Sequence, residues 1–306
     1  MKLMSVTIDV EPDCSPSWHY SDPLRFEGVR VGIGERLQPL FDSLGVRPTY
    51  LINNVVLEDP ESVTTLRGLG RGVELGTHLH PEFIEPGKVF TSYAGVKAES
   101  NLCSFAPDVE FRKIEGITKL FEERVGFTPR VFRAGRFSAG TNTIRSLERL
   151  GYLVDTSVTP NVIWDDSTRE RPVDFRTAPG FPYLVGDSIL QEDRNGSVLE
   201  VPVSIGTVRR WFHSRVRWLR PKLSTYGDLR ALTRVCTNAQ RHRGMVVLNM
   251  MFHNVEVVSG LSPYSLTPTD CVRYLSTLER FLGLVRKEGF LFVTLSELYE
   301  LIRPRR

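Results

Sequence analysis

The alternation of strand-like and helix-like segments constrains the fold of this chain more than any other feature of its sequence. The clearest strand is expected from Met245 to Phe252, an apolar run typical of a parallel strand that is buried on both faces. The longest helix is expected from Pro268 to Lys287, where the sequence has the pattern of an amphipathic helix. Repeated units of this kind form a parallel sheet covered by helices.

The same pattern predicts further elements along most of the chain. Further strands are expected at about 3–9, 48–55, 73–78, 131–134, 152–158, 198–205 and 290–295, and further helices at about 34–45, 60–69, 106–125, 142–150, 226–241 and 296–301. The alternation breaks over about 160–225, which is rich in proline, glycine and charge for much of its length. We therefore predict a single domain over 1–306 with an irregular insertion at about 160–225.

Five polar residues indicate how the sheet closes. Asp9, His78, Arg133, Asp155 and His253 each fall at or just past the end of a different expected strand. In a β/α barrel these strand ends converge on one face, where the active site lies. An open, doubly wound sheet would spread the five residues along a line. The sequence therefore favours an α/β fold of the barrel type, with parallel strands.

Composition excludes several classes of protein. A formal net charge of +3 over 306 residues is too small to imply nucleic-acid binding. The dispersed cysteines, Cys14, Cys103, Cys236 and Cys271, are typical of reduced thiols in a cytoplasm rather than of a disulfide framework. The first residues do not resemble a signal peptide, and no apolar run approaches the roughly 18 residues that span a membrane. We therefore expect a cytoplasmic protein.

A pair of histidines and a pair of carboxylates together suggest a metal site. His78 and His80 are two residues apart at a strand end, so their side chains would point to the same side if the strand continues. Asp9 and Glu11 share a face for the same reason. One carboxylate beside two imidazoles makes a three-ligand site that is open to water, and the second carboxylate could act as a base. The alternative is a polar, solvated loop in each case.

Other residues suit acid–base chemistry or substrate binding. An apolar surround would keep His253 neutral while a nearby Asp would help it hold a proton, and such opposed effects suit an acid or base near neutral pH. Arg133 and Arg136 could hold a carboxylate, or they could form surface ion pairs. Trp18 and His19 follow the first strand and could contact substrate.

The order of these motifs resembles the polysaccharide deacetylases, carbohydrate esterase family 4. The matching segments, which span roughly 3–300, are Asp9-Val10-Glu11, His78-Leu79-His80-Pro81, Arg133-Ala134-Gly135-Arg136, Asp155-Thr156-Ser157 and Phe252-His253-Asn254. The resemblance implies a distorted, incomplete β/α barrel. It also implies a metal-dependent hydrolase that removes an acetyl group from an N-acetylated sugar.

Roles follow from the resemblance position by position. It implies that Asp9 is the catalytic base, oriented by Arg133, and that His253 is the general acid, tuned by Asp155. The metal ligands would be Glu11, His78 and His80. Substrate contacts are expected from Arg136, Trp18 and His19. This nitrogen and oxygen ligand set favours Zn²⁺, with Co²⁺ or Ni²⁺ as substitutes.

The sequence departs from the family at two places. Val10 separates Asp9 from Glu11, where the family has adjacent aspartates, and one residue separates the histidines, where the family commonly has three. Counted from His78, Glu82 would occupy the second histidine position. Two other functions therefore stay open: an amidohydrolase-type enzyme acting on a cyclic amide, and a sugar-binding relative without activity.

A basic segment bears on the partner. From Arg209 to Lys222 the chain has six basic residues and no acid, interleaved with Trp211, Phe212 and Trp218. One interpretation is a solvated surface. The other is a contact with anionic phosphate, either on a nucleotide sugar or on a lipid-linked sugar at the inner membrane face, where aromatic and basic residues gather. The resemblance favours the second, because relatives often belong to surface-polysaccharide pathways.

Overall fold

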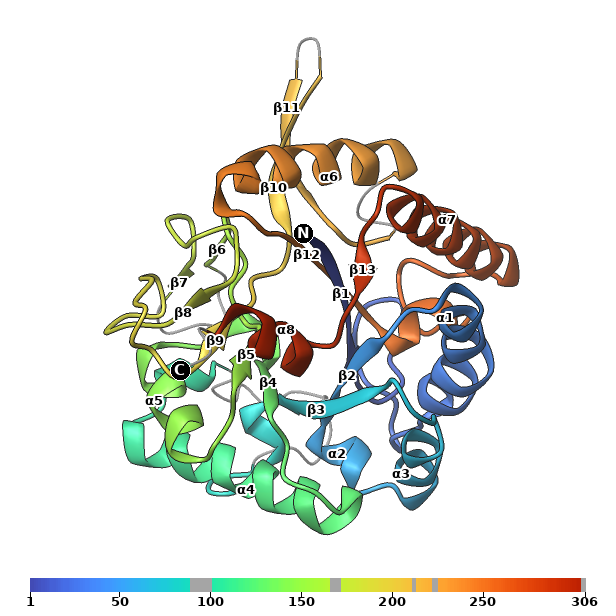
Figure 1. Ribbon diagram of the computed structural model, residues 1–306. Helices are drawn as coiled ribbons and strands as arrows, with labels where there is room; N and C mark the ends of the chain where they lie inside the picture. The colour runs from blue at the N-terminus through green and yellow to red at the C-terminus, as the bar shows by residue number, and fades with distance from the viewer. Residues whose placement is uncertain (89–100, 166–171, 211–212, 222–224, 304–306) are drawn as a thin grey trace. The chain divides into compact units, whose positions relative to one another are not determined.

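The computed structural model describes residues 1–88, 101–165, 172–210, 213–221 and 225–303 (Figure 1). The chain forms two compact units. The first unit consists of 1–50, 64–74 and 203–294, and the second of 51–63, 75–202 and 295–306. The prediction of a single domain over 1–306 is not tested by this division and stays a prediction.

The first unit is built on a pair of long parallel strands. β1 (Lys2–Val10) pairs in parallel with β12 (Val246–His253) along its length, and β13 (Leu291–Phe292) lies on the other side of its beginning. All but the first residue of β1 are buried, as expected of a strand covered on both faces. The register ends on the pair Asp9 and His253, so the strand pairing itself places these two residues side by side.

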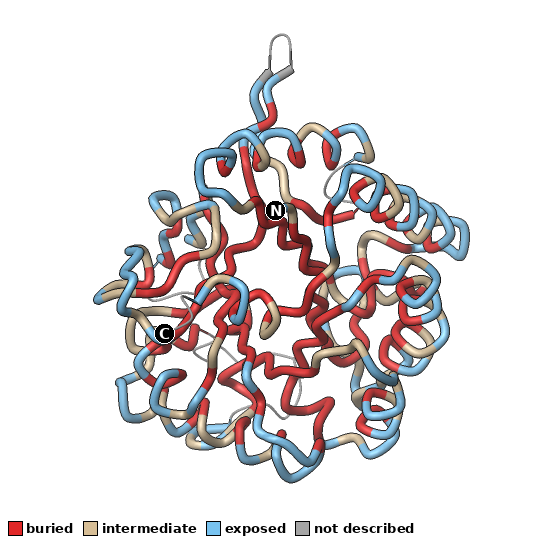
Figure 2. Tube along the Cα trace, viewed as in Figure 1, coloured by how far each residue is buried: buried red, intermediate tan, exposed pale blue. Residues whose placement is uncertain are grey.

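Helices cover these strands, and their exposed outer faces can be followed in Figure 2. They are a wide helical stretch at Gly28–Leu37, α1 (Gln38–Leu44), α6 (Tyr226–Gln240) and α7 (Pro268–Lys287). The start of α7 is fixed locally: the Thr267 hydroxyl accepts from the Asp270 amide, and the Asp270 carboxylate accepts from the Thr267 amide. Such a cap stabilises a helix by about 1 kcal/mol.

The second unit continues the parallel arrangement. β2 (Pro48–Asn53) belongs to both units and is followed in the sheet by β3 (Glu74–Leu79), β4 (Val131–Ala134), β5 (Val154–Asp155) and β9 (Leu199–Glu200). Gly76 allows β3 to approach β4 closely, because a Cβ there would lie 2.6 Å from the carbonyl oxygen of Val131. The flanking helices are α2 (Asn54–Leu57), α4 (Pro107–Val125), α5 (Thr141–Arg149) and α8 (Leu295–Ile302), and α3 (Pro60–Arg67) is divided between the two units.

The strand order confirms the predicted fold class, a distorted and incomplete β/α barrel. The order is β12-β1-β2-β3-β4-β5-β9-β8, with β13 beside β1, so among the described residues the path stays open between β12 and β8 (Tyr183–Leu184). β8 runs antiparallel to β9, which the expectation of parallel strands did not include. No helix in the described ranges is long and apolar enough to cross a membrane.

The segment at about 160–225 is only partly irregular. It contains a short antiparallel pair, β6 (Ile163–Trp164) with β7 (Val173–Asp174). It also contains a regular β-hairpin, β10 (Ile205–Arg210) with β11 (His213–Trp218), which the sequence did not predict. The strand expected at about 198–205 shortens to the two residues of β9, because the chain leaves the sheet before it enters the hairpin.

Candidate active site

In the first unit, His253 faces two carboxylates. Its Nε2 lies 3.9 Å from Oδ2 of Asp9 and 3.9 Å from Oε1 of Glu11. The ring of Trp18 packs against the imidazole, with ring centroids 5.2 Å apart. His253 is the last residue of β12, and its side chain is only 16% exposed. The strand pairing thus brings the predicted base and the predicted acid into one place.

The other nitrogen of His253 contacts a glutamate that the sequence analysis missed. Nδ1 lies 2.9 Å from Oε1 of Glu256, and the same oxygen accepts the backbone N–H of His253 at 3.0 Å. Arg220 donates to this oxygen as well, and the hydroxyl of Tyr274 donates to Oε2 at 2.8 Å. Glu256 lies in a helical turn, Asn254–Val257, three residues after His253, and this spacing was the available signal.

Glu256 carries a charge although it is fully buried. Burial alone would raise its pKa, but the Arg220 guanidinium and the adjacent His253 outweigh burial and hold the pKa of Glu256 below its usual value. Arg220 is itself buried and lies with its guanidinium over the ring of Tyr264. The outcome is a buried ion pair in direct contact with the imidazole.

Glu11 is held through its backbone and its side chain. The side-chain oxygen of Asn254 accepts the Glu11 amide N–H at 2.9 Å, and its amide nitrogen donates to the Glu11 carbonyl at 3.0 Å. The hydroxyl of Tyr20 donates to Oε2 of Glu11 at 2.8 Å. Gly28 leaves room for this clamp, because a Cβ there would lie 2.7 Å from Nδ2 of Asn254.

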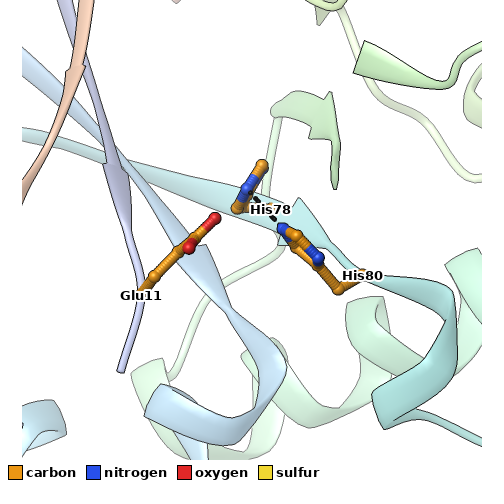
Figure 3. A group of neighbouring side chains, drawn as sticks. All are labelled: Glu11, His78 and His80. Carbon is orange, nitrogen blue, oxygen red and sulfur yellow. Dashed lines mark hydrogen bonds between the residues drawn. The ribbon is translucent and has the colours of Figure 1, made fainter. Parts of the chain in front are cut away.

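In the second unit, the two histidines at the end of β3 face each other (Figure 3). Their Nε2 atoms are 3.2 Å apart, and both residues are buried. Nδ1 of His78 lies 3.1 Å from the backbone carbonyl of Arg133. A carbonyl only accepts, so Nδ1 donates and Nε2 of the neutral ring keeps its lone pair. This is the tautomer that a metal ligand needs, fixed by a backbone contact.

His80 has its own set of contacts. Arg136 has φ +52°, an uncommon value for a residue other than glycine. Its side chain bonds Oε1 of Glu82 at 2.6 Å and lies 3.1 Å from Nδ1 of His80. Burial opposes the charge on Glu82, but His80 and Arg136 lower the pKa of Glu82 to about 2. Gly135 leaves space for the imidazole, because a Cβ there would lie 2.6 Å from the His80 ring.

Arg133 and Asp155 are fully buried at the ends of β4 and β5. Arg133 donates from Nε to the carbonyl of Thr156 at 2.8 Å and from Nη2 to its hydroxyl at 3.0 Å. Asp155 accepts from the hydroxyl of Ser157 at 2.6 Å and lies opposite Glu200 in the sheet. Burial raises the pKa of both carboxyls, and the repulsion from Asp155 raises that of Glu200 further. Each carboxyl therefore keeps its proton to a higher pH than usual.

Comparison with known proteins agrees with this architecture. No protein-family model matches the chain, and no curated protein sequence matches it. Among solved structures, a protein from Mycobacterium smegmatis assigned to the polysaccharide deacetylases matches with a TM-score of 0.61 at 18% identity, over 99% of this chain and 90% of that one. Puue allantoinase matches with a TM-score of 0.59 at 13% identity, over 100% of this chain and 92% of that one. A second protein assigned to the polysaccharide deacetylases, from Pseudomonas aeruginosa PAO1, matches with a TM-score of 0.57 at 13% identity, over 100% and 93%.

The chain has the polysaccharide deacetylase fold. Within this fold, the five residues predicted at strand ends, Asp9, His78, Arg133, Asp155 and His253, are each the last or the second-last residue of their strand. Their chemical roles stay predictions, including the orienting of Asp9 by Arg133 and the tuning of His253 by Asp155. The same holds for substrate binding by Arg136, Trp18 and His19. Trp18 packs on His253, whereas His19 is exposed and bonds the hydroxyl of Ser17 at 2.8 Å.

Proposed function

We propose that this protein is a metal-dependent hydrolase that removes an acetyl group from an N-acetylated sugar. One observation carries the proposal: Glu11, His78 and His80 each offer a ligand atom, and these atoms all lie within 4.8 Å of one another (Figure 3). One carboxylate and two imidazoles are a common protein ligand set for a catalytic metal with an open position. The tautomer of His78 suits this role.

The donors fit a divalent cation that accepts nitrogen and oxygen ligands. Zn²⁺ is the expected ion, with Co²⁺ or Ni²⁺ as substitutes. When bound by Glu11, His78 and His80, it would act as a Lewis acid and lower the pKa of water towards about 7.

Residues of the chain would move the protons of the reaction. Asp9 would take the proton of the attacking water, and Arg133 would orient the Asp9 carboxylate. His253 would protonate the departing nitrogen, because an amide nitrogen leaves poorly without a proton. Acid–base help of this kind contributes roughly 10²–10⁴ in rate. Arg136 lies beside His80 and Trp18 packs on His253, and both would contact the sugar. The exposed His19 would contact it as well.

The test is a comparison of two reactions with the purified protein and added Zn²⁺. Acetate release from N-acetylated sugars supports the proposal. Ring opening of a cyclic amide without acetate release would instead favour the amidohydrolase-type alternative. We test this alternative because the chain shares its fold with an allantoinase. Sugar binding with neither reaction would indicate a non-catalytic relative.

The basic segment suggests how the sugar is carried. Arg209 and Arg215 on the hairpin β10–β11 are exposed, and the hairpin extends beyond α6 (Figure 1). Arg217 pairs with Asp228 on α6 at 3.3 Å. Arg220 belongs to the interior, where it holds Glu256, so it adds nothing to this surface. Trp211, Phe212 and Lys222 lie outside the described residues.

We propose that this hairpin contacts the anionic phosphate of a nucleotide-linked or lipid-linked sugar, in the second case from the cytoplasm at the inner membrane face. Each exposed cation near an anionic bilayer gains roughly 1 kcal/mol. Wild-type protein should therefore co-sediment with anionic vesicles at low salt and be released at high salt. A variant with Arg209 and Arg215 changed to Ser should bind less, while a variant with Arg273 and Arg286 of α7 changed to Ser should bind as the wild type does. Equal sedimentation of all three proteins would contradict the membrane contact.

A further inference from the structure

The environment of Glu256 shows how the ring of His253 is set. A single carboxylate oxygen receives the backbone N–H and the ring Nδ1 of the same residue, at 3.0 and 2.9 Å. An ionised carboxylate can only accept hydrogen bonds, so Nδ1 donates in its bond to Glu256, and the neighbouring guanidinium of Arg220 donates its own hydrogen to the same carboxylate oxygen. The two contacts together restrict rotation of the side chain relative to its own backbone.

Glu256 stays ionised because of Arg220. The guanidinium is protonated at every accessible pH, and it contacts Oε1 from a buried position. Tyr274 satisfies the other carboxylate oxygen. Nη2 of Arg220 also lies 3.0 Å from Nδ1 of His253, so the guanidinium and the imidazole meet at the same carboxylate oxygen. The carboxylate is therefore the acceptor for a proton on Nδ1.

The position of the other ring nitrogen of His253, Nε2, is then fixed as well. With the Nδ1 proton held by Glu256, Nε2 is the nitrogen that exchanges protons, and it faces Asp9 and Glu11 at 3.9 Å each. Trp18 packs on the same imidazole. A ring flipped by 180° would lose the bond to Glu256 and would present its protonated nitrogen to the wrong side.

We propose that Glu256, held ionised by Arg220, is a positioning residue that fixes the tautomer and orientation of His253. This rests on the proposed function in so far as His253 acts as the general acid. It gives Glu256 the role that the sequence resemblance assigned to Asp155. Glu256 contacts the imidazole directly, whereas the contacts of Asp155 described above are with Ser157 and Glu200.

The kinetic test compares two leaving groups in the Zn²⁺-loaded, full-length protein. An N-acetylated sugar needs a proton on its leaving nitrogen, whereas 4-nitrophenyl acetate releases a phenolate that does not. Glu256→Gln should lower kcat on the amide about 100-fold, within the range for lost acid–base help, and lower it on the ester less than about 3-fold. Tyr274→Phe, which removes only the bond to Oε2, should leave the ratio of the two rates unchanged.

Three results would overturn the proposal. The first is an amide rate of Glu256→Gln within about 3-fold of the wild type. The second is a parallel fall on both substrates, which would indicate a structural role only. The third is a selective loss of amide turnover in Asp155→Asn but not in Glu256→Gln, which would return the role to Asp155.

A second measurement needs no variant of Glu256 and no activity. In ¹⁵N-histidine spectra of the wild type at a pH where the rings are neutral, His253 should show the tautomer with the proton on Nδ1. The signal is assigned by its loss in His253→Gln. The opposite tautomer would refute the inference even in an active enzyme. A wild type that hydrolyses neither substrate would count against the proposed function, and this spectrum would still decide the role of Glu256.

Discussion

Glu256 in the first unit and the pair Asp155–Glu200 in the second unit are all fully buried carboxyls, yet their pKa values are shifted in opposite directions. The pKa of Glu256 is lowered, because Arg220 and His253 outweigh the cost of burial. The pKa of Glu200 is raised well above its usual value by burial and by Asp155, and the attraction of Arg133 is too small to reverse this. Burial is common to both regions, so the cation in contact decides the direction in which the pKa is shifted.

The difference matters for catalysis. A carboxylate that is ionised over the working pH range can hold a ring N–H and stabilise a charged imidazole. A pair of buried carboxyls whose pKa values are both raised offers a weaker and pH-dependent charge. The structure therefore favours Glu256 over Asp155 as the partner of His253, and the predictions below bear on this comparison.

The largest effect is expected from His253 itself. His253→Ala should lower turnover of an N-acetylated sugar by roughly 10²–10⁴, because the leaving nitrogen loses its proton donor. The bound metal should remain, because His253 is outside the proposed ligand set. Steady-state rates with metal analysis of the same sample check both points. Turnover close to that of the wild type would mean that His253 is not the general acid. The contact between Glu256 and His253 would then have no role in catalysis.

The next largest effect is expected in the free energy of unfolding of variants at Glu256 and at Glu200. Glu256→Gln should destabilise the protein by about 3–5 kcal/mol at pH 7, because it leaves the buried Arg220 without its anionic partner. Glu200→Gln should change stability by less than about 1 kcal/mol, because burial and Asp155 favour the neutral form of Glu200, which glutamine resembles. Urea unfolding of both variants provides the measurement. Equal losses would mean that the two carboxyls are in the same charge state.

Glu110 extends the comparison to a buried carboxyl whose main described partner is neutral. It is buried in α4 and accepts from the hydroxyl of Thr143, and burial raises its pKa to about 7. A raised pKa in the folded state contributes stability below the unfolded pKa of about 4.5, and this contribution is lost as pH rises through about 7.

Glu110→Gln should therefore remove part of the pH dependence. Between pH 5 and pH 8.5 the wild type should lose on the order of 2 kcal/mol more stability than the variant. Denaturation curves at several pH values would show this. A constant difference between the two proteins across the range would mean that Glu110 is ionised throughout.

Local signals allowed much of the fold to be predicted from the sequence. The bounds of α7 match the expected 268–287, because Pro268 follows a capping threonine and the apolar spacing is regular. β4 also matches its expected range. The hairpin β10–β11 was missed, because its strands are basic and their pairing depends on tertiary contacts with α6 rather than on an apolar pattern.

The site could be predicted as a set of positions but not as a set of contacts. Parallel strands place their ends together, so Asp9 and His253 could be recognised as strand-end residues. The partner of His253 could not be identified this way. Arg220 is 33 residues away in the chain, in a segment predicted to be either a solvated surface or a contact with anionic phosphate, and its burial depends on packing.

Metal content tests the central claim, a metal site formed by Glu11, His78 and His80, most directly. Purified wild-type protein should hold close to one divalent ion per chain after exposure to Zn²⁺ and removal of excess. His80→Ala should lose the ion and His78→Ala should at least weaken its binding, because each removes one of the proposed ligands. The matched control His19→Ala changes an exposed histidine outside this group and should keep the ion. Full occupancy in both His78→Ala and His80→Ala would contradict the account.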